Sequence, residues 1–266
     1  MFKLFFSLIL ITNLLYAKSW YNNFHPSLEA GMHLATFKGN IENINSTASF
    51  ENDLGYDRSF SSYFVFGLKS DYKYFPHFYV NYFNETQSKD VNTPKKIYVA
   101  NAVFDTNSSL SSTIDYKVIN VVLYKDLKIK GERFQFLRWN IYPGDIEFDI
   151  GMSAKIVHWK IQLTKNVNNG VYPYWIIVDE TIPLPYFGFK HYFYNLRTYG
   201  SISALSLNNA KSLNYEVGIE YRLIKNLYIS ASYLYEGFEA VEERNAHRDT
   251  VSFKTVGNKF SFKYFF

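Results

Sequence analysis

Two segments of the chain bring together side chains that hydrolytic enzymes use. Residues 25–28 read His-Pro-Ser-Leu, which approaches the His-x-Ser-Asn phrase of a phospholipase but has Leu28 in place of Asn. Residues 239–249 contain several acids and His247, and acids near a histidine can activate a water molecule for proteolysis. A charged run of this kind is also typical of a solvated loop whose charges pair with each other. Both segments therefore remain weak candidates for hydrolysis.

The spacing of the candidate residues gives little indication of a metal, cofactor or modification site. Glu51, Asp53 and Asp57 could offer oxygens to Ca²⁺, but their spacing is not that of an EF-hand, and a turn with Gly55 at a special backbone angle is favoured. The histidines share no metal-ligand spacing, and no glycine-rich phosphate loop is present. Residues 105–109 (Asp-Thr-Asn-Ser-Ser) fit an acidic N-glycosylation sequon. We expect no cofactor and no metal.

Composition narrows the class of protein. Of 266 residues, 20% are aromatic, 47% hydrophobic and 20% charged, and none is cysteine. The missing cysteines exclude disulfides, Cys-ligated metals and thiol catalysis. A net charge of +4 is too small for its length to indicate nucleic-acid binding. A mean hydropathy of −0.19 excludes a bundle of membrane helices, yet the aromatic content is unusually high for a soluble protein.

The first residues have the layout of a secretory signal. A basic start ending at Lys3 is followed by an apolar run over residues 4–15 and then by the small Ala17. The run is too short to span a bilayer as a helix, so we expect a signal peptide over 1–17, cleaved after Ala17. The alternative is an uncleaved anchor. Residues 18–266 then form a single exported domain.

Apolar and polar residues alternate along most of this domain, which predicts β-strands with one apolar and one polar face. The alternation predicts about ten strands, with eight or twelve as alternatives: 28–38, 59–69, 77–87, 113–125, 146–162, 181–193, 199–208, 213–224, 227–239 and 253–266. The faces of 113–125 and 199–208 do not sort cleanly. Links of two kinds should join the strands: short links at 70–76, 194–198 and 224–226, and long links at 39–58, 88–112, 163–180 and 240–252. The long 126–145 and the short 209–212 depart from this pattern.

Such a pattern fits either a soluble β-sandwich or a transmembrane barrel. Three features favour an all-β, up-and-down antiparallel barrel: strands of about ten residues, links that alternate in length, and charges that recur on the second face. That face should line the lumen, where these residues are expected to pair: Glu29, His33, Lys69, Glu216, Glu220, Arg222, Lys259 and Lys263. A barrel of this size is largely filled by its own side chains, unlike an aqueous porin.

The chain ends on an aromatic strand. Phe260, Phe262, Tyr264 and Phe266 share one face. A terminal Phe after alternating apolar residues resembles the signal that outer-membrane barrels show to their assembly machinery. This machinery, periplasmic chaperones, membrane lipids and lipopolysaccharide are the expected partners, and both termini should be periplasmic.

Several segments together resemble a family of Gram-negative outer-membrane β-barrels known only as outer membrane proteins, with no assigned activity. They are LEAGMHLATFKG (28–39), NDLGYD (52–57), YFVFGLKSDYKYFPHFYVNYF (63–83), INVVLYKDL (119–127), IPLPYFGFK (182–190), NYEVGIEYRL (214–223) and LYISASYLYEGF (227–238). The segment 129–144 departs from the family pattern. The resemblance implies the fold and the cell outer membrane, and it carries no catalytic residues.

We therefore expect a non-enzymatic surface, structural or binding protein of the outer membrane with a largely plugged lumen. A narrow, porin-like channel for small solutes is the first alternative. A hydrolase at the outer rim, either an omptin-like protease or an enzyme acting on lipid A or phospholipid, is the second.

Overall fold

The computed structural model describes residues 23–43, 45–99, 102–136, 139–167, 170–206, 210–244 and 247–266. All regular elements in these ranges are strands. No helix in this described part of the chain is long and apolar enough to cross a membrane. The expected signal peptide, with its cleavage at Ala17, lies outside the described residues.

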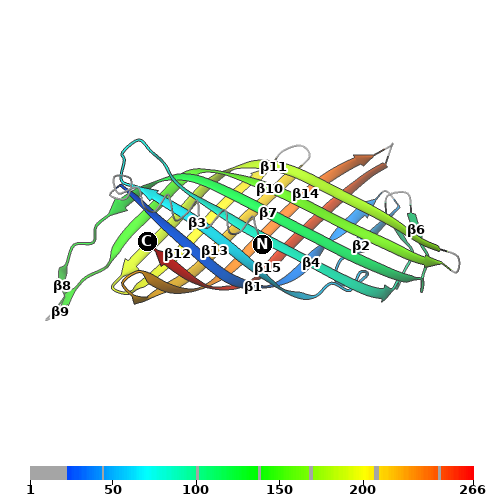
Figure 1. Cartoon of the computed structure of the whole chain (residues 1–266), viewed down its shortest axis with the longest axis horizontal. Helices are drawn as coiled ribbons and strands as arrows, with labels where there is room; N and C mark the ends of the chain where they lie inside the picture. The colour runs from blue at the N-terminus through cyan, green and yellow to red at the C-terminus, as the bar shows by residue number, and fades with distance from the viewer. Residues whose placement is uncertain are drawn as a thin grey trace, which may run out of the picture.

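A sheet of eleven strands dominates the molecule, and ten of them close into a barrel (Figure 1). The ten barrel strands are β1 (Phe24–Asn43), β3 (Arg58–Ser70), β4 (His77–Asn92), β7 (Ser109–Ile129), β10 (Asp145–Val167), β11 (Gly170–Phe193), β12 (Leu196–Ser206), β13 (Ala210–Ile224), β14 (Leu227–Arg244) and β15 (His247–Phe265). Each pairs antiparallel with its neighbours in chain order, and β15 pairs with β1 from Phe265 opposite Ser27 to Thr250 opposite Glu42. The prediction of an up-and-down antiparallel barrel of about ten strands is confirmed.

The two ends of the barrel differ. At the end that we call the turn end, β3–β4, β11–β12 and β13–β14 are joined by links at 71–76, 194–195 and 225–226. The hairpin of β8 (Phe134–Phe136) and β9 (Trp139–Ile141) also extends beyond the barrel here (Figure 1). The departure predicted for 126–145 is therefore a separate hairpin, placed between β7 and β10.

The opposite end, which we call the loop end, carries three additional short strands. They are β2 (Ser46–Ser49), β5 (Ile97–Val99) and β6 (Ala102–Phe104). β2 pairs with the last residues of β1, and β5 pairs with β6. Ser46 Oγ lies 2.8 Å from Tyr98 N and 3.1 Å from Tyr98 O, which ties the two long loops together.

Two predicted long links are wrong. The segments 163–180 and 240–252 are mostly strand, because β10 and β11 pair to Val167 opposite Gly170, and β14 and β15 pair to Arg244 opposite His247. β11 contains three prolines, and its pairing shows why they are tolerated. Pro173, Pro183 and Pro185 all precede Tyr186, where pairing with β12 begins, so they lie where β11 has its pairing on the β10 side. Proline is tolerated at a strand edge because no ladder hydrogen bond is lost there.

The outer wall of the barrel is apolar across its middle. Alternate residues of every strand point outward, and large hydrophobic side chains among them are exposed, for example Phe60 (65%), Phe262 (62%) and Ile150 (62%). Others of this belt are Leu28, Met32, Leu34, Phe64, Ile119, Leu123, Met152, Ile156, Phe187, Ile202, Val217, Ile219, Ile229 and Phe260. An apolar surface of this extent is unfavourable in water and favourable in lipid.

Candidate functional site in the lumen

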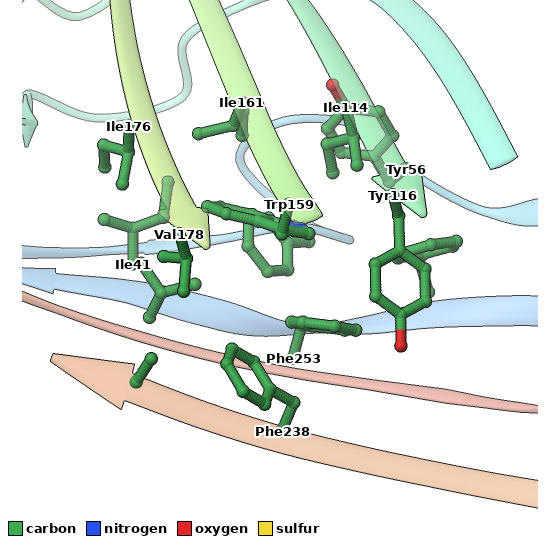
Figure 2. Close-up of a cluster of buried hydrophobic side chains, with 14 of the residues drawn as sticks. Ile41, Tyr56, Ile114, Tyr116, Trp159, Ile161, Ile176, Val178, Phe238 and Phe253 are labelled. Atoms are coloured by element: carbon green, nitrogen blue, oxygen red, sulfur yellow. The ribbon is translucent and has the colours of Figure 1, made fainter. Parts of the chain in front are cut away.

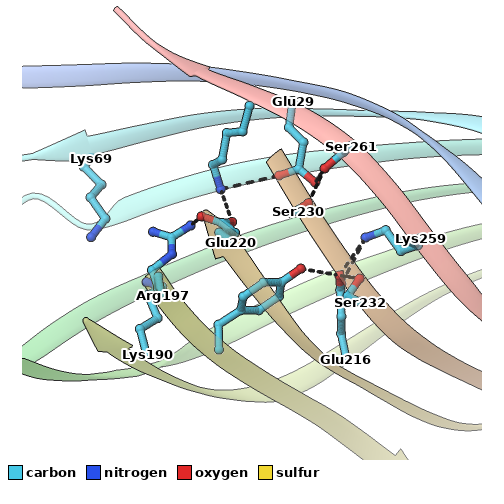
Figure 3. A network of polar contacts seen from close by, with 12 residues as sticks. Glu29, Lys69, Lys190, Arg197, Glu216, Glu220, Ser230, Ser232, Lys259 and Ser261 are labelled. Carbon is cyan, nitrogen blue, oxygen red and sulfur yellow. Dashed lines mark hydrogen bonds and ion pairs between the residues drawn. The ribbon is translucent and has the colours of Figure 1, made fainter. Parts of the chain in front are cut away.

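The lumen next to the turn end contains buried, mutually paired charges (Figure 3). Both carboxylate oxygens of Glu216 lie 3.0 Å from Lys259 Nζ. Ser232 Oγ and Tyr199 OH also donate to Glu216, at 2.6 and 3.2 Å. The Lys259 ammonium lies 4.2 Å from the centre of the Tyr63 ring. The contacts around Glu216 and Lys259 therefore replace the water that both charges lose on burial.

A second group surrounds Glu29 and Glu220. Ser261 Oγ donates to Glu29 at 2.9 Å, and Lys263 Nζ lies 3.4 Å from the other Glu29 oxygen. Lys263 also lies 3.5 Å from Glu220, which binds Arg197. The chain of alternating charges crosses from β1 and β15 to β13 and β12.

A third group centres on Glu147, whose side chain is 2% exposed. Lys69 Nζ and Lys190 Nζ each lie 2.7 Å from Glu147 Oε1, and Tyr192 OH donates to the other oxygen at 3.3 Å. Lys190 also binds Asp149. These contacts join β3 to β10 and β11 across the lumen.

Between these groups lies a cavity of about 170 Å³. Its walls combine the paired charges with tyrosine and asparagine side chains, among them Tyr79, Tyr124, Tyr186, Asn81 and Asn120. The turn-end half of the lumen is therefore polar and incompletely filled.

The lumen toward the loop end is apolar, contrary to the expectation of a polar lumen along the whole barrel. Six aromatic residues, Phe37, Phe50, Tyr116, Trp159, Phe238 and Phe253, form what we call the aromatic plug. Figure 2 shows four of them, Tyr116, Trp159, Phe238 and Phe253, facing one another together with Ile41. The inward positions of β1, β7, β10, β14 and β15 change from polar to apolar toward this end, so the same alternating pattern builds a charged lumen at one end and a hydrophobic core at the other.

The long loops complete the aromatic plug. Phe50 is fully buried with its ring centre 6.0 Å from that of Trp159, and Leu54 is also fully buried. Burial raises the pKa of Tyr56, in the same loop, because the ionised phenol would lose its hydration. Gly55 has φ = 71°, which confirms the predicted turn with a special backbone angle.

Asp53 holds this loop in place. Its carboxylate accepts the Ser49 N–H at 2.7 Å and lies 3.0 Å from Lys95 Nζ in the other long loop. Removing it leaves the Ser49 N–H without this acceptor, so Asp53→Ala is expected to weaken the packing of the loop by about 1–3 kcal/mol. Protease cleavage after Lys95 should become faster. Asp57→Ala, at an exposed carboxylate of the same loop, is the control and should leave the rate unchanged; equal rates in the two variants would contradict this role of Asp53.

The structure brings six of the predicted lumen residues into these groups: Glu29, Lys69, Glu216, Glu220, Lys259 and Lys263. Arg222 does not join them, because it lies at the end of β13, where it is exposed and donates to Asn195 at the turn end. His33 is fully buried but is not the hydrogen-bond partner that was expected. Its ring nitrogens make no hydrogen bond among the described residues, and the ring packs against Phe83.

Several members of the network were not predicted, namely Tyr199, Arg197, Glu147, Asp149 and Lys190, and Glu236, which lies 3.6 Å from Lys155. A signal for some of them existed. Glu147 and Asp149 alternate with Phe148 and Ile150, which places them on the polar face of β10. Lys155, on the same face, is 1% exposed and lies 2.7 Å from Asn214.

The other candidates for chemistry are dispersed. His25 pairs with Asp71 at the turn end, 2.8 Å apart, and both side chains are exposed. Glu51 lies 3.1 Å from Lys38, away from the contacts of Asp53, and the described residues form no cluster suited to a metal ion. Asn107 of the sequon is exposed at φ = 64°. The side chain of His247 lies outside the described residues.

The four C-terminal aromatic residues Phe260, Phe262, Tyr264 and Phe266 are exposed at 52%, 62%, 40% and 41%. Their place on the outside of the barrel makes them accessible to a partner before membrane insertion. Their role as an assembly signal stays a prediction.

A closed antiparallel barrel with an apolar outside and charges inside has the organisation of a membrane β-barrel. Solved structures with a similar arrangement include the outer membrane protease OmpT from Escherichia coli (7% identity, TM-score 0.43, 92% of this chain and 97% of that chain covered). The translocator domain of the autotransporter NalP from Neisseria meningitidis (6%, 0.42, 91% and 88%) and the toluene transporter TodX from P. putida (9%, 0.29, 91% and 90%) are also similar.

No protein-family model matches the chain, and neither does any curated protein. The low identities and TM-scores of the similar structures carry no information on a ligand or a reaction of this chain. Its function has to be argued from its own lumen and surface.

Proposed function

We propose that this chain is an integral protein of the bacterial outer membrane, a non-enzymatic surface protein whose lumen is closed. The apolar belt supports insertion into a bilayer, since alternating lipid-facing and lumen-facing residues are typical of outer-membrane barrels. The resemblance to outer-membrane proteins and the signal-like first residues support the same location. In this orientation the turn end faces the periplasm and the loop end faces the outside.

The observation that carries the closed lumen is the aromatic plug. Trp159 and Phe50 are fully buried and Phe253 is 3% exposed, although all three lie at the loop end. The loops that hold Phe50 and Ile97 pack against barrel side chains instead of extending into solvent. A solute would have to displace this hydrophobic core, so the loop end serves as a compact outer surface.

The absence of a solute path is testable in planar lipid bilayers. The purified full chain is expected to show no steady ionic conductance. The variant Phe50→Gly/Leu54→Gly, which removes the loop side chains of the aromatic plug, is expected to conduct intermittently because water can reach the polar lumen below. Tyr74→Gly, at a residue of the turn end that is 87% exposed, is the control and should remain silent. Steady conductance of the unmodified chain would overturn the closed-lumen proposal.

A narrow conduit for small solutes is the second candidate, favoured by the cavity of about 170 Å³ in the polar lumen. Because this cavity lies beside charges of both signs, it suits small polar molecules. Transport would require the long loops to withdraw, and a conductance that appears only on addition of a solute would support this candidate over the first.

A further inference from the structure

The outer wall over β12–β15 has two hollows, one nearer the loop end and one below it. The upper hollow, of about 620 Å³, is lined by Gly39, Lys211, Gly237, Glu239, Ser252 and Lys254. The lower hollow, of about 630 Å³, is lined by Gly200, Val217, Ile219, Ala231, Asn258 and Phe260. Tyr215 lies between them along β13, and its ring stacks on Tyr235 with centres 4.9 Å apart.

The upper hollow has Lys211, Glu239 and Lys254 among its lining residues, and Lys38 lies next to it on β1. Lys254 of β15 is directly opposite Lys38 of β1 and opposite Gly237 of β14. Like charges directly opposite on one face of a sheet repel each other. Lys38 lies 3.1 Å from Glu51, whereas the exposed Lys254 has no hydrogen bond or ion pair within the described residues. An anion at the hollow would relieve this repulsion.

On the third side of the upper hollow, Lys211 lies 2.7 Å from Glu239. These two residues are the first outward-facing charges of β13 and β14 beyond the apolar belt, which places the hollow at the boundary between lipid tails and head groups. Its lining also includes Ser206 and Ser252 together with Leu213 and Tyr235, whose ring covers Gly237.

The lower hollow is mostly apolar, and Thr198, Ser232 and Asn258 are among the polar residues that line it. Val217, Ile219 and Phe260 surround the small side chain of Ala231, which is opposite both Ile219 and Phe260. Asn258 is exposed on the same outer face, opposite Leu34 and Tyr233, and its amide has no partner in the described part of the chain. An amide facing lipid without a partner is unfavourable, so a polar group of a bound lipid would stabilise it.

We propose that the two hollows form one site for an anionic lipid of the outer leaflet that carries a phosphorylated head group and several acyl chains, as lipid A does. The phosphate binds Lys254 in the upper hollow and the neighbouring Lys38 beside it, while Lys211 stays paired with Glu239. An acyl chain fills the lower hollow, and Asn258 hydrogen-bonds an ester, amide or hydroxyl group of that chain. Lys254 and Asn258 are four residues apart, about 13 Å along β15, which suits a lipid extending from phosphate to upper acyl chain. The site rests on the proposed location in the outer membrane.

The head-group contact is tested with the full chain in nanodiscs containing labelled diphosphoryl lipid A. Lys38→Gln/Lys254→Gln is expected to bind it about ten- to thirty-fold more weakly, since each lysine at a membrane surface contributes modestly to binding an anionic lipid. The matched control is Lys117→Gln/Lys160→Gln, which removes two lysines from the opposite wall and should bind as the unmodified chain does. Equal binding by all three proteins would overturn the site.

The acyl contact is tested separately with Gly200→Leu. A Cβ added at Gly200 would come no closer than 3.6 Å to Glu216 O and 3.9 Å to Val217 Cγ2, so the barrel tolerates it while the longer side chain fills the hollow. This variant is expected to bind lipid A several-fold more weakly. Competition by inorganic phosphate as strong as that by lipid A would show a simple phosphate site and overturn the lipid proposal.

Failure of the lipid site and failure of the proposed function have different signatures. If the chain fractionates with the outer membrane but all variants retain equal lipid A, the site is wrong and the proposed function stands. If the unmodified chain does not fractionate with the outer membrane, the proposed function is wrong, and the site loses its premise.

Discussion

Replacing Phe253 by alanine is expected to lower the free energy of unfolding of the barrel by about 3–5 kcal/mol, the usual cost of removing a buried phenylalanine side chain. Phe253 is the centre of the aromatic plug. Its ring is stacked on Trp159 with centres 6.0 Å apart and an interplanar angle of 9°. It also meets Tyr116 edge-on at 4.7 Å, and it lies 5.4 Å from Phe238 and 6.3 Å from Phe37.

The cost is high because the neighbours cannot collapse into the space. The contacting rings belong to four different strands of a closed sheet, whose spacing is fixed by backbone hydrogen bonds. The measurement is urea-induced unfolding in lipid vesicles, followed by tryptophan fluorescence. Because Trp159 itself reports on the packing at this site, the folded variant should also show a red-shifted emission.

Phe262→Ala is the matched control for this experiment. Phe262 lies on the same strand but points outward and is 62% exposed, so its removal leaves no internal cavity. We expect a smaller effect for Phe262→Ala than for Phe253→Ala. A larger loss at Phe262 than at Phe253 would show that the plug does not contribute to stability as a packed core.

The second large effect is expected from Lys259→Met. Lys259 is 5% exposed, and its ammonium lies 3.0 Å from both carboxylate oxygens of Glu216. The substitution keeps most of the side-chain volume but leaves Glu216 as an uncompensated charge in the lumen. Removing one partner of a buried ion pair costs about 3–5 kcal/mol. The same unfolding measurement applies.

A double variant separates the charge from the packing. In Lys259→Met/Glu216→Gln no unpaired charge remains, so stability should recover by more than half of the loss. Lys117→Met removes the lysine of a partly exposed pair with Asp115, 2.8 Å apart, and should cost under about 1 kcal/mol. A double variant no more stable than Lys259→Met would indicate that the loss arises from packing and not from the ion pair.

The success of the strand predictions and the failure of the loop prediction at 163–180 have one explanation. Alternation is a local property, so the ten strands could be found wherever apolar residues recur at every second position, as along β13. In the first third of β11, neighbouring residues are all apolar or aromatic, as in Val171 to Val178. The period therefore disappears although the strand continues.

The candidate site shows the same division. The alternating pattern of each strand correctly placed Glu29, Glu216 and Lys259 on the polar face, which points into the lumen. Arg222 was expected to face inward as well, but alternation does not tell which side chains meet, and near the end of β13 it contacts Asn195 of the turn instead. His33 also points inward and is directly opposite Lys259, but its ring packs against Phe83 and makes no hydrogen bond among the described residues.

The sequence by itself determined that this chain forms antiparallel strands with an apolar and a polar face, because the two-residue period is a property of neighbouring residues. Only the tertiary structure decided which inward side chains meet. Ser261 reaches Glu29 across 232 residues, and Lys259 reaches Glu216 across 43. Which of these side chains come into contact depends on the register and closure of the whole barrel. The division of the lumen into a charged half and an aromatic plug depends on the same two properties. The physical reason is that the registers of all strand pairs around the barrel together determine which residues meet across the lumen. A local sequence pattern contains no information on these registers.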